Sequence, residues 1–174
     1  MFRFGIHGYL PHWLNGRAAV TEAHGRRLAG LTGRTLRHVW LLWDLADDEW
    51  FSDAPVLLDL GAERAEVDHQ KFDDLSITWN TVDPARAVED PYFRLAWRPE
   101  PLPLLAGLPG RTVQGVELLE WAGDRHDLAN GSVALGLDLA PDYLILYNAL
   151  DENGLTAGPP DRRYRRHRCD VPRD

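Results

Sequence analysis

Residues Leu28–Thr35 read LAGLTGRT, and residues Leu105–Thr112 read LAGLPGRT. Seven of the eight positions are identical, at an offset of 77 residues. Agreement of this extent indicates an internal duplication, and a duplication governs how the rest of the sequence is interpreted. The chain is therefore expected to fold as two related halves.

Apolar residues further along the chain repeat at the same offset. The matched pairs are Val39 and Val116, Leu41 and Leu118, Leu42 and Leu119, Val56 and Val133, Leu58 and Leu135, and Leu60 and Leu137. Later the offset shortens to 68, where Ile77, Asn80 and Asp83 match Ile145, Asn148 and Asp151. Shared positions that alternate along the chain predict strands with one buried face.

The apolar spacing also predicts where the elements lie. A helix is expected over 17–29, ended by Gly30. Strands are expected over 36–43, 56–60, 65–69 and 75–82 in the first half, and over 113–121, 133–137 and 143–150 in the second. Six of the twelve prolines lie between Pro84 and Pro109, which indicates a connection between the halves.

These elements predict a mainly β (α+β) protein with a short N-terminal helix. We expect an internally duplicated antiparallel sandwich or barrel, with two repeats of three to four strands around a pseudo-two-fold axis. The parts of this single compact domain are an N-terminal segment (1–32), the first β repeat (33–83), a proline-rich connection (84–109), the second β repeat (110–154) and an arginine-rich C-terminal tail (155–174). The residues expected to be buried together are Val39, Leu41, Leu58, Ile77, Val116, Leu118, Leu135 and Ile145.

Charge is unevenly distributed along the chain. The formal net charge is −8, yet residues 161–174 hold six arginines against three acids. The acidic remainder argues against nucleic acid and anionic membranes as partners, because both bind clustered basic residues. The tail is expected to be a solvated terminus or a strap folded onto the acidic body, with contact to a polyanion as the alternative.

Cysteine and lysine usage bear on the cellular setting. Cys169 is the single cysteine, so no internal disulfide can form and a reducing compartment is expected. Neither a secretory leader nor a long apolar run is present in the sequence, and we expect a cytoplasmic protein. Arginine outnumbers lysine 18 to 1, which is typical of high-GC coding. Arg168 beside Cys169 would lower the pKa of the thiol.

Sequence motifs exclude several chemistries. The chain has neither a G-x-G-x-x-G nor a G-x-x-x-x-G-K-[ST] loop, so no nucleotide cofactor is expected. No serine lies in a G-x-S-x-G turn. Neither an HExxH motif nor paired cysteines occur, and the acidic run around Asp44 and Asp53 fits no EF-hand spacing. No metal is therefore expected.

Candidate functional residues are expected where the two repeats differ. Trp40, Trp43 and Asp44 are replaced in the second repeat by Glu117, Glu120 and Trp121. The first repeat also holds an insertion that contains His69, Lys71, Asp73 and Asp74. A tryptophan wall, a histidine and paired carboxylates could form a polar pocket, in which a nearby carboxylate would raise the pKa of His69. The predicted binding residues are Trp40, Trp43, Asp44, Trp50, Lys71, Asn80 and Asn148.

Asn80 and Asn148 occupy matching positions at strand ends, which allows two interpretations. Each amide could bond neighbouring backbone in a turn, which we favour, or the two could converge near the pseudo-two-fold axis.

Two functions from different classes remain open at this point. The first is a binding protein that presents an acidic, tryptophan-containing surface to a protein partner, as small acidic proteins that neutralise a toxin do. The alternative is a cofactor-independent enzyme that uses His69, Asp73 and Asp74 for acid–base chemistry on a small molecule, such as isomerisation, cyclisation or hydrolysis. A structural role and a homodimer are also compatible with the sequence.

Overall fold

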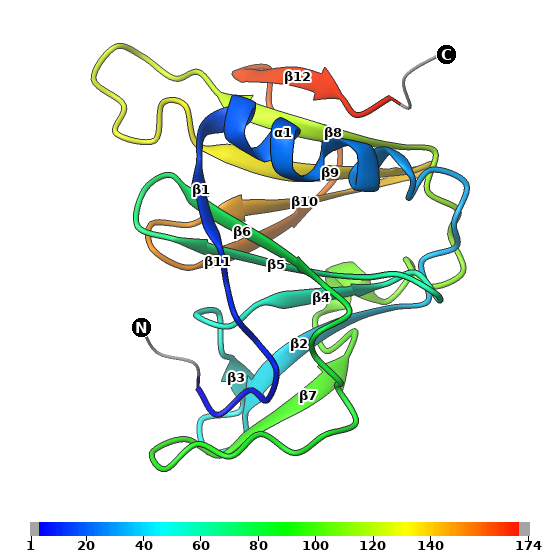
Figure 1. Ribbon diagram of the computed structural model, residues 1–174, viewed down its shortest axis with the longest axis vertical. Coiled ribbons are helices and arrows are strands. Elements are labelled where there is room, and N and C mark those ends of the chain that lie inside the picture. Colours follow the sequence, from blue (N-terminus) through cyan, green and yellow to red (C-terminus); the bar gives the residue numbers. More distant parts are fainter. Residues whose placement is uncertain (1–3, 171–174) are drawn as a thin grey trace.

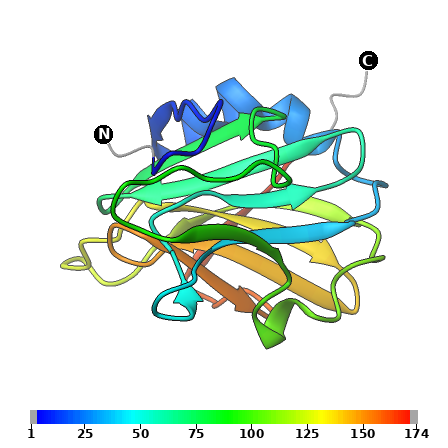
Figure 2. The same ribbon diagram turned by 90° about the horizontal axis from the view of Figure 1, so that it is seen from below.

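The computed structural model describes residues 4–170, and within them the protein is mainly β. Two antiparallel sheets face each other (Figures 1 and 2). The seven-stranded sheet has the order β1 (Trp13–Asn15), β6 (Asp74–Trp79), β5 (Arg64–Gln70), β4 (Val56–Asp59), β2 (His38–Asp44) and β3 (Glu49–Trp50), with β7 (Leu95–Pro99) also paired to β2. The five-stranded sheet has the order β11 (Asn153–Ala157), β10 (Asp142–Asn148), β9 (Val133–Leu139), β8 (Gly115–Trp121) and β12 (Tyr164–Arg168).

Each sheet is built on a four-strand antiparallel meander. In the first sheet β2, β4, β5 and β6 pair in chain order, and in the second β8, β9, β10 and β11 do the same. β2 and β8 begin and end 77 residues apart, as the repeat predicts. The shorter offset of 68 does not hold structurally: it aligns β6, the fourth strand of its meander, with β10, the third.

The duplicated Gly-Arg-Thr segments pair with each other. Thr35 and Thr112, which are equivalent at the offset of 77, form an antiparallel bridge. Four backbone hydrogen bonds surround it in two matching pairs. They run from the Gly33 amide to Val113 O, from the Gly110 amide to Leu36 O, from the Val113 amide to Arg34 O and from the Leu36 amide to Arg111 O, each 2.8 Å long. Gly33 and Gly110 both have left-handed φ values, +85° and +88°.

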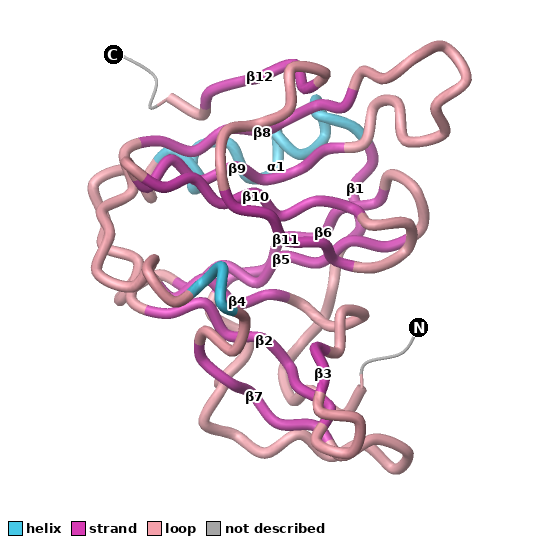
Figure 3. Tube along the Cα trace, turned by 180° about the vertical axis from the view of Figure 1, so that it is seen from behind, coloured by secondary structure: helices cyan, strands magenta, loops and turns pink. Residues whose placement is uncertain are grey.

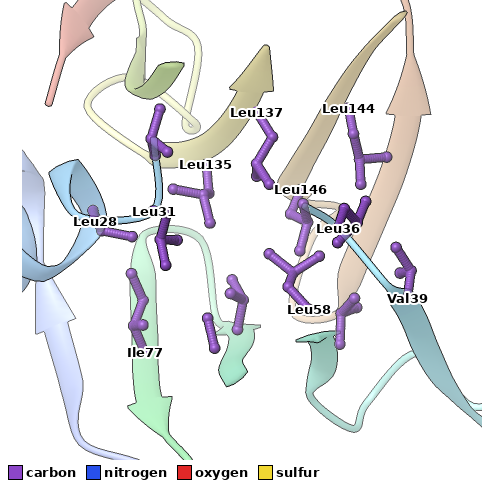
Figure 4. Close-up of a cluster of buried hydrophobic side chains, with 14 of the residues drawn as sticks. Leu28, Leu31, Leu36, Val39, Leu58, Ile77, Leu135, Leu137, Leu144 and Leu146 are labelled. Atoms are coloured by element: carbon purple, nitrogen blue, oxygen red, sulfur yellow. The ribbon is translucent and has the colours of Figure 1, made fainter. Parts of the chain in front are cut away.

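The main apolar core lies between the two sheets (Figure 4). Of the eight residues predicted to be buried together, all but one belong to this cluster. The exception is Ile145, which lies in a separate cluster with Leu119, Ala134 and Tyr143. β10 is apolar on both faces, and Leu144 and Leu146 occupy the inward positions. The prediction for Ile145 was wrong because alternation cannot choose between two apolar faces.

The outer faces of the two sheets differ. A second cluster buries the outer face of the first sheet and includes Ile6, Tyr9, Leu57 and Val82. The cluster on the second sheet is smaller and contains aromatic residues that are only partly buried. The second sheet therefore keeps a more accessible outer face.

Helix α1 (Gly16–Ala29) contacts β1 and β6 of the first sheet and β8 of the second (Figure 1). Val20 and Leu28 are fully buried, so the helix joins both sheets to the core. Gly30 follows the helix as expected, but in the right-handed region, with its amide bonded to Arg26 O. A single 3₁₀ turn, η1 (Pro103–Leu105), precedes the second repeat.

Two segments expected to be irregular contain strands. The connection 84–109 includes β7, which pairs with β2, and the tail 155–174 includes β12, which pairs with β8. These two strands lie at opposite ends of the molecule (Figure 3). Arg166 contacts Glu117 at 2.7 Å, so the strap interpretation of the tail describes this segment. Residues 171–174 of the predicted tail lie outside the described part. Within residues 4–170 no helical segment combines the length and apolar character that a bilayer span requires.

Candidate functional site

A buried polar network of Tyr9, Asp68, His69 and Asn153 joins the two sheets. Each of these side chains is at most 4% exposed. The Asn153 amide nitrogen donates to Asp68 Oδ1 at 2.8 Å, and its oxygen accepts from the His69 backbone amide at 2.9 Å. The Tyr9 hydroxyl donates to Asp68 Oδ2 at 2.7 Å. Asn153 belongs to β11 of the second sheet, whereas Asp68 and His69 belong to β5 of the first sheet. The network therefore holds the two sheets in a fixed position relative to each other.

Both ring nitrogens of His69 face oxygen acceptors. Nδ1 lies 3.0 Å from Asn153 Oδ1, and Nε2 lies 3.2 Å from the Val133 carbonyl oxygen. The Asn153 amide orientation is fixed because its nitrogen also donates to the carbonyls of Ser52 and Ala54. Burial lowers the pKa of His69, although both hydrogen bonds act in the opposite direction. The expectation that a carboxylate would raise this pKa was wrong, because burial has the largest effect and both ring nitrogens contact neutral oxygens.

Burial shifts the pKa of Asp68 upward, whereas it shifts the pKa of His69 downward. Burial raises the pKa of Asp68 to about 7, while the hydrogen bonds from Tyr9 and Asn153 lower it in part. Burial, followed by the negative charge of Asp68, raises the pKa of Tyr9 above its ordinary value. Asp68 is therefore a carboxyl group that can change protonation near neutral pH.

The network forms one wall of an open cavity of about 370 Å³, which we call the acidic pocket. Its lining residues are Phe4, Tyr9, Pro11, Trp13, Asp53, Asp68, His69, Gln70 and Asp151. Three carboxylates and no lysine or arginine line it. Burial and the charges of Glu152 and Asp151 raise the pKa of Asp53. Within residues 4–170 the Asp53 carboxylate, which is exposed to solvent, has neither a hydrogen-bond nor an ion-pair partner.

Three loops position the acidic residues of this pocket. The turn between β5 and β6 and the turn between β10 and β11 lie side by side (Figure 1), where the Asp151 amide donates to Lys71 O at 2.7 Å. The loop that holds Asp53 joins them, because the Asn153 amide donates to Ser52 O at 3.0 Å. Ser52 Oγ also donates to Glu152.

The predicted tryptophan wall does not form. Trp40 and Trp43 are three residues apart on β2 and therefore project from opposite faces of the strand. Trp40 packs in the outer cluster of the first sheet. Trp43 pairs across the strands with Trp50, and its indole nitrogen donates to Asp48 Oδ1 at 2.9 Å.

The predicted acidic residues have separate positions. Asp44 is 6% exposed and accepts a hydrogen bond from the Ala46 amide, which stabilises a turn. Lys71, in the β5–β6 turn, forms an exposed ion pair with Asp74 at 3.0 Å. Asp73 has no partner within the described residues, and neither Asp73 nor Asp74 is among the residues that line the acidic pocket. Of the predicted catalytic residues, only His69 lies at this cavity.

Asn80 and Asn148 bond neighbouring backbone in two different places. Asn80 Oδ1 accepts from the Arg64 amide at 2.7 Å, and Asn148 Nδ2 donates to Gln70 O at 3.1 Å. These contacts agree with the turn-stabilising interpretation of the pair. The expectation that Arg168 would lower the pKa of Cys169 was wrong, since burial and then the charge of Asp170 raise the pKa of the thiol to about 11.

Sequence reasoning missed Tyr9, Asp53, Asp68 and Asn153. Asp68 precedes His69 on a strand that is buried on both faces, and alternation alone assigned it to a solvent face. Asn153 lies in the run Asp151-Glu152-Asn153-Gly154, which is typical of a turn, and the N-terminal segment that holds Tyr9 has no periodic pattern. Two adjacent ionisable residues on a buried strand were the one available signal.

Within residues 4–170 no group of three or more histidine, cysteine, aspartate or glutamate side chains is arranged to hold a metal ion. Comparison of the chain with protein-family models, curated proteins and solved structures found no match.

Proposed function

We propose that this protein is a binding protein that holds a basic side chain of a protein partner in the acidic pocket. The observation that carries the proposal is the unpaired Asp53 carboxylate, which lines the pocket with Asp68 and Asp151, while no lysine or arginine lines it. A guanidinium or ammonium group placed there would relieve the repulsion between these carboxylates.

The other walls of the pocket suit the same ligand. Tyr9 and Trp13 contribute aromatic surface, which attracts cations through the negative face of the ring. The net charge of −8 would speed the approach of a basic partner. A small acidic protein that neutralises a basic protein, such as a toxin, is the functional class that combines these properties.

The direct test uses N-acetyl-arginine methylamide as a probe, followed by amide NMR shifts. We expect shifts at Asp53, Gln70 and Asp151, and none with the uncharged citrulline analogue. Asp53→Asn should weaken binding by about tenfold, since hydrogen bonds to charged groups contribute about 1.5–3 kcal/mol. Asp47→Asn, which removes an exposed acid outside the pocket, is the matched control.

The partner itself is sought by crosslinking in the native host, with wild type and Asp53→Asn compared. A basic protein that the wild type captures and the variant does not would support the proposal. Equal binding of the arginine and citrulline probes would refute it.

A second function, acid–base catalysis on a small molecule, is favoured by one specific observation. Asp68 lines a cavity and has a pKa of about 7, as a general acid or base requires. In this case Asp68→Asn would abolish turnover of an isomerisation, cyclisation or hydrolysis substrate, while Asp53→Asn would leave turnover measurable.

We also propose that the two meanders descend from one duplicated unit and pack as a sandwich around a pseudo-two-fold axis. The matched hydrogen bonds between the two Gly-Arg-Thr segments support this arrangement, because each bond has a counterpart 77 residues away.

A further inference from the structure

The outer face of the second sheet carries a second cavity, an open groove of about 570 Å³ that we call the aromatic groove. Trp121, Tyr147 and Tyr164 line it, and Ala134 and Ile145 form its apolar floor. The loops 122–132 and 158–163 contribute its walls. It shares no lining residue with the acidic pocket, so it is a separate candidate site.

A glycine shapes the floor of the aromatic groove. Tyr147 lies opposite Gly154 in the pairing of β10 with β11. A Cβ atom added to Gly154 would lie 2.4–2.7 Å from three atoms of the Tyr147 ring. The ring therefore lies flat against the sheet, and its other face is available to the groove. Flat aromatic surfaces of this kind pack well against the apolar face of a ligand ring.

Four hydroxyl groups of the lining residues have no hydrogen-bond partner within residues 4–170. They belong to Ser132, Tyr147, Thr156 and Tyr164. Burial, and then the neighbouring Tyr147, raises the pKa of Tyr164 to about 12, so this phenol stays neutral at physiological pH. A neutral hydroxyl can both donate and accept a hydrogen bond. The groove thus offers several such groups above an apolar floor.

The two carboxylates that line the groove already accept hydrogen bonds from the protein. Asp127 accepts from the Trp121 indole nitrogen at 2.7 Å and from the Ala129 amide at 2.9 Å. Asp161 is held by both guanidinium contacts of Arg163, and the Arg163 guanidinium lies 4.4 Å from the Trp121 ring centroid. Arg163 forms an ion pair with Asp161. The hydrogen bond from Trp121, and then the charge of Arg163, lowers the pKa of Asp127. Both carboxylates therefore lie near a resident cation, whereas no lysine or arginine lines the acidic pocket.

We propose that the aromatic groove binds a neutral saccharide. A sugar ring combines an apolar face, which suits the aromatic floor, with several hydroxyls that both donate and accept, which suits the four unpartnered hydroxyls. The cavity volume lies within the range of small-molecule sites, about 300–1,000 Å³. Apolar planar molecules would leave the hydroxyls unsatisfied, and ionic ligands would lose solvation without a partner.

The test titrates the full chain with methyl glucoside, methyl galactoside and N-acetylglucosamine, followed by amide NMR shifts. We expect at least one saccharide to shift the amides of Trp121, Ser132 and Thr156 while those of Asp53 and Gln70 stay unchanged. Tetramethylammonium, acetate and indole serve as cationic, anionic and apolar planar comparisons, and we expect smaller shifts from each.

Hydroxyl deletions then separate recognition from packing. Tyr147→Phe and Tyr164→Phe keep the rings, and each should weaken saccharide binding by about threefold to tenfold, as expected for one hydrogen bond. Tyr143→Phe is the matched control, because Tyr143 lies on the same sheet face outside the groove and donates to Glu117.

Three results would overturn the proposal. The first is the absence of groove shifts with every saccharide up to its solubility limit. The second is a stronger response to tetramethylammonium, acetate or indole. The third is an equal effect of Tyr143→Phe and the two groove variants. Each of these readouts is independent of arginine binding in the acidic pocket, so failure here leaves the proposed function standing, and the reverse also holds.

Discussion

Single residues in the buried network control how stability depends on pH. The pKa of Asp68 rises from 3.8 to about 7 on folding, so the folded state favours the protonated carboxyl. This contribution to stability is complete below about pH 4 and is lost as the pH rises through about 7. Asp68→Asn should remove this pH dependence, because asparagine does not titrate. The difference in free energy of unfolding, wild type minus variant, should fall by up to about 4 kcal/mol as the pH rises from about 4 to above 7, since one pKa unit corresponds to about 1.4 kcal/mol.

Denaturant unfolding of both proteins across this pH range measures the difference directly. His69 has the opposite sign: its lowered pKa means that its contribution is present above its ordinary pKa of 6.5 and lost as the pH falls. Subtracting the variant from the wild type cancels this second effect. A difference that stays constant with pH would contradict the assignment to Asp68.

His69 and Asp73 should respond differently to substitution. His69→Ala removes the buried ring and its contacts with Asn153 Oδ1 and the Val133 carbonyl, while the backbone amide at this position still donates to Asn153, and we expect a loss of about 1–3 kcal/mol in the free energy of unfolding. Asp73→Asn should change stability by less than about 0.5 kcal/mol, because Asp73 has no partner within residues 4–170. Thermal and urea unfolding would check both. The burial of His69, which is 2% exposed, is the reason for the larger effect expected there.

At the scale of the elements, paired strands were predictable where alternation reported a single buried face. β2 and β8 lie close to their expected bounds because Val39 and Leu41, and their equivalents Val116 and Leu118, alternate toward the core between the sheets, although Leu42 and Leu119 are also buried on the outer faces. β12 was missed because an edge strand rich in arginine has no apolar pattern to detect. The buried network was missed for another reason: its contacts join residues 59 and 85 positions apart, such as Tyr9 with Asp68 and Asn153 with Asp68.

Equivalent leucines on β2 and β8 test the shared core. Leu41 is 0% exposed and Leu118 1% exposed, and both belong to the cluster between the sheets. Replacing either with alanine should cost about 2–5 kcal/mol in the free energy of unfolding, measured with urea. Leu128→Ala, at a position that is 76% exposed, is the control and should be nearly neutral. A loss below about 1 kcal/mol at both buried positions would show that the core is assigned to the wrong faces.

The two Gly-Arg-Thr segments permit a matched test of duplication. Gly33 and Gly110 share a left-handed φ, and a Cβ atom at either would meet no atom within 4 Å. Gly33→Ala and Gly110→Ala should therefore cost the same, about 1–2 kcal/mol each, from backbone strain alone. Gly107 has equal space and no left-handed φ, so Gly107→Ala should cost little. Unequal losses at the first two positions would argue against equivalent roles.

At the scale of the whole molecule, the C-terminal strand β12 contributes both ion pairs and packing contacts. Deleting residues 161–174 removes β12 and the aromatic contact of Tyr164 with Trp121, whose ring centroids lie 4.9 Å apart. We expect lower stability, and high salt should recover only a small part of it, because exposed ion pairs contribute little. Arg165→Gln with Arg166→Gln keeps the strand and removes its charges, and should cost much less. Equal losses from the deletion and the double substitution would show that charge dominates.

The bridge between Thr35 and Thr112 has a consequence for the history of the chain. Each Gly-Arg-Thr segment bonds to a copy of itself, which makes the contact self-complementary, as in a symmetric dimer. If the two meanders descend from one duplicated unit, as we propose, a protein half this length would have had the surface needed to associate with a second copy. Joining two such copies through one connecting peptide would make their association independent of concentration. The aromatic groove is lined by the second half alone, whereas the acidic pocket is lined mostly by residues before the second half, together with Asp151 from it.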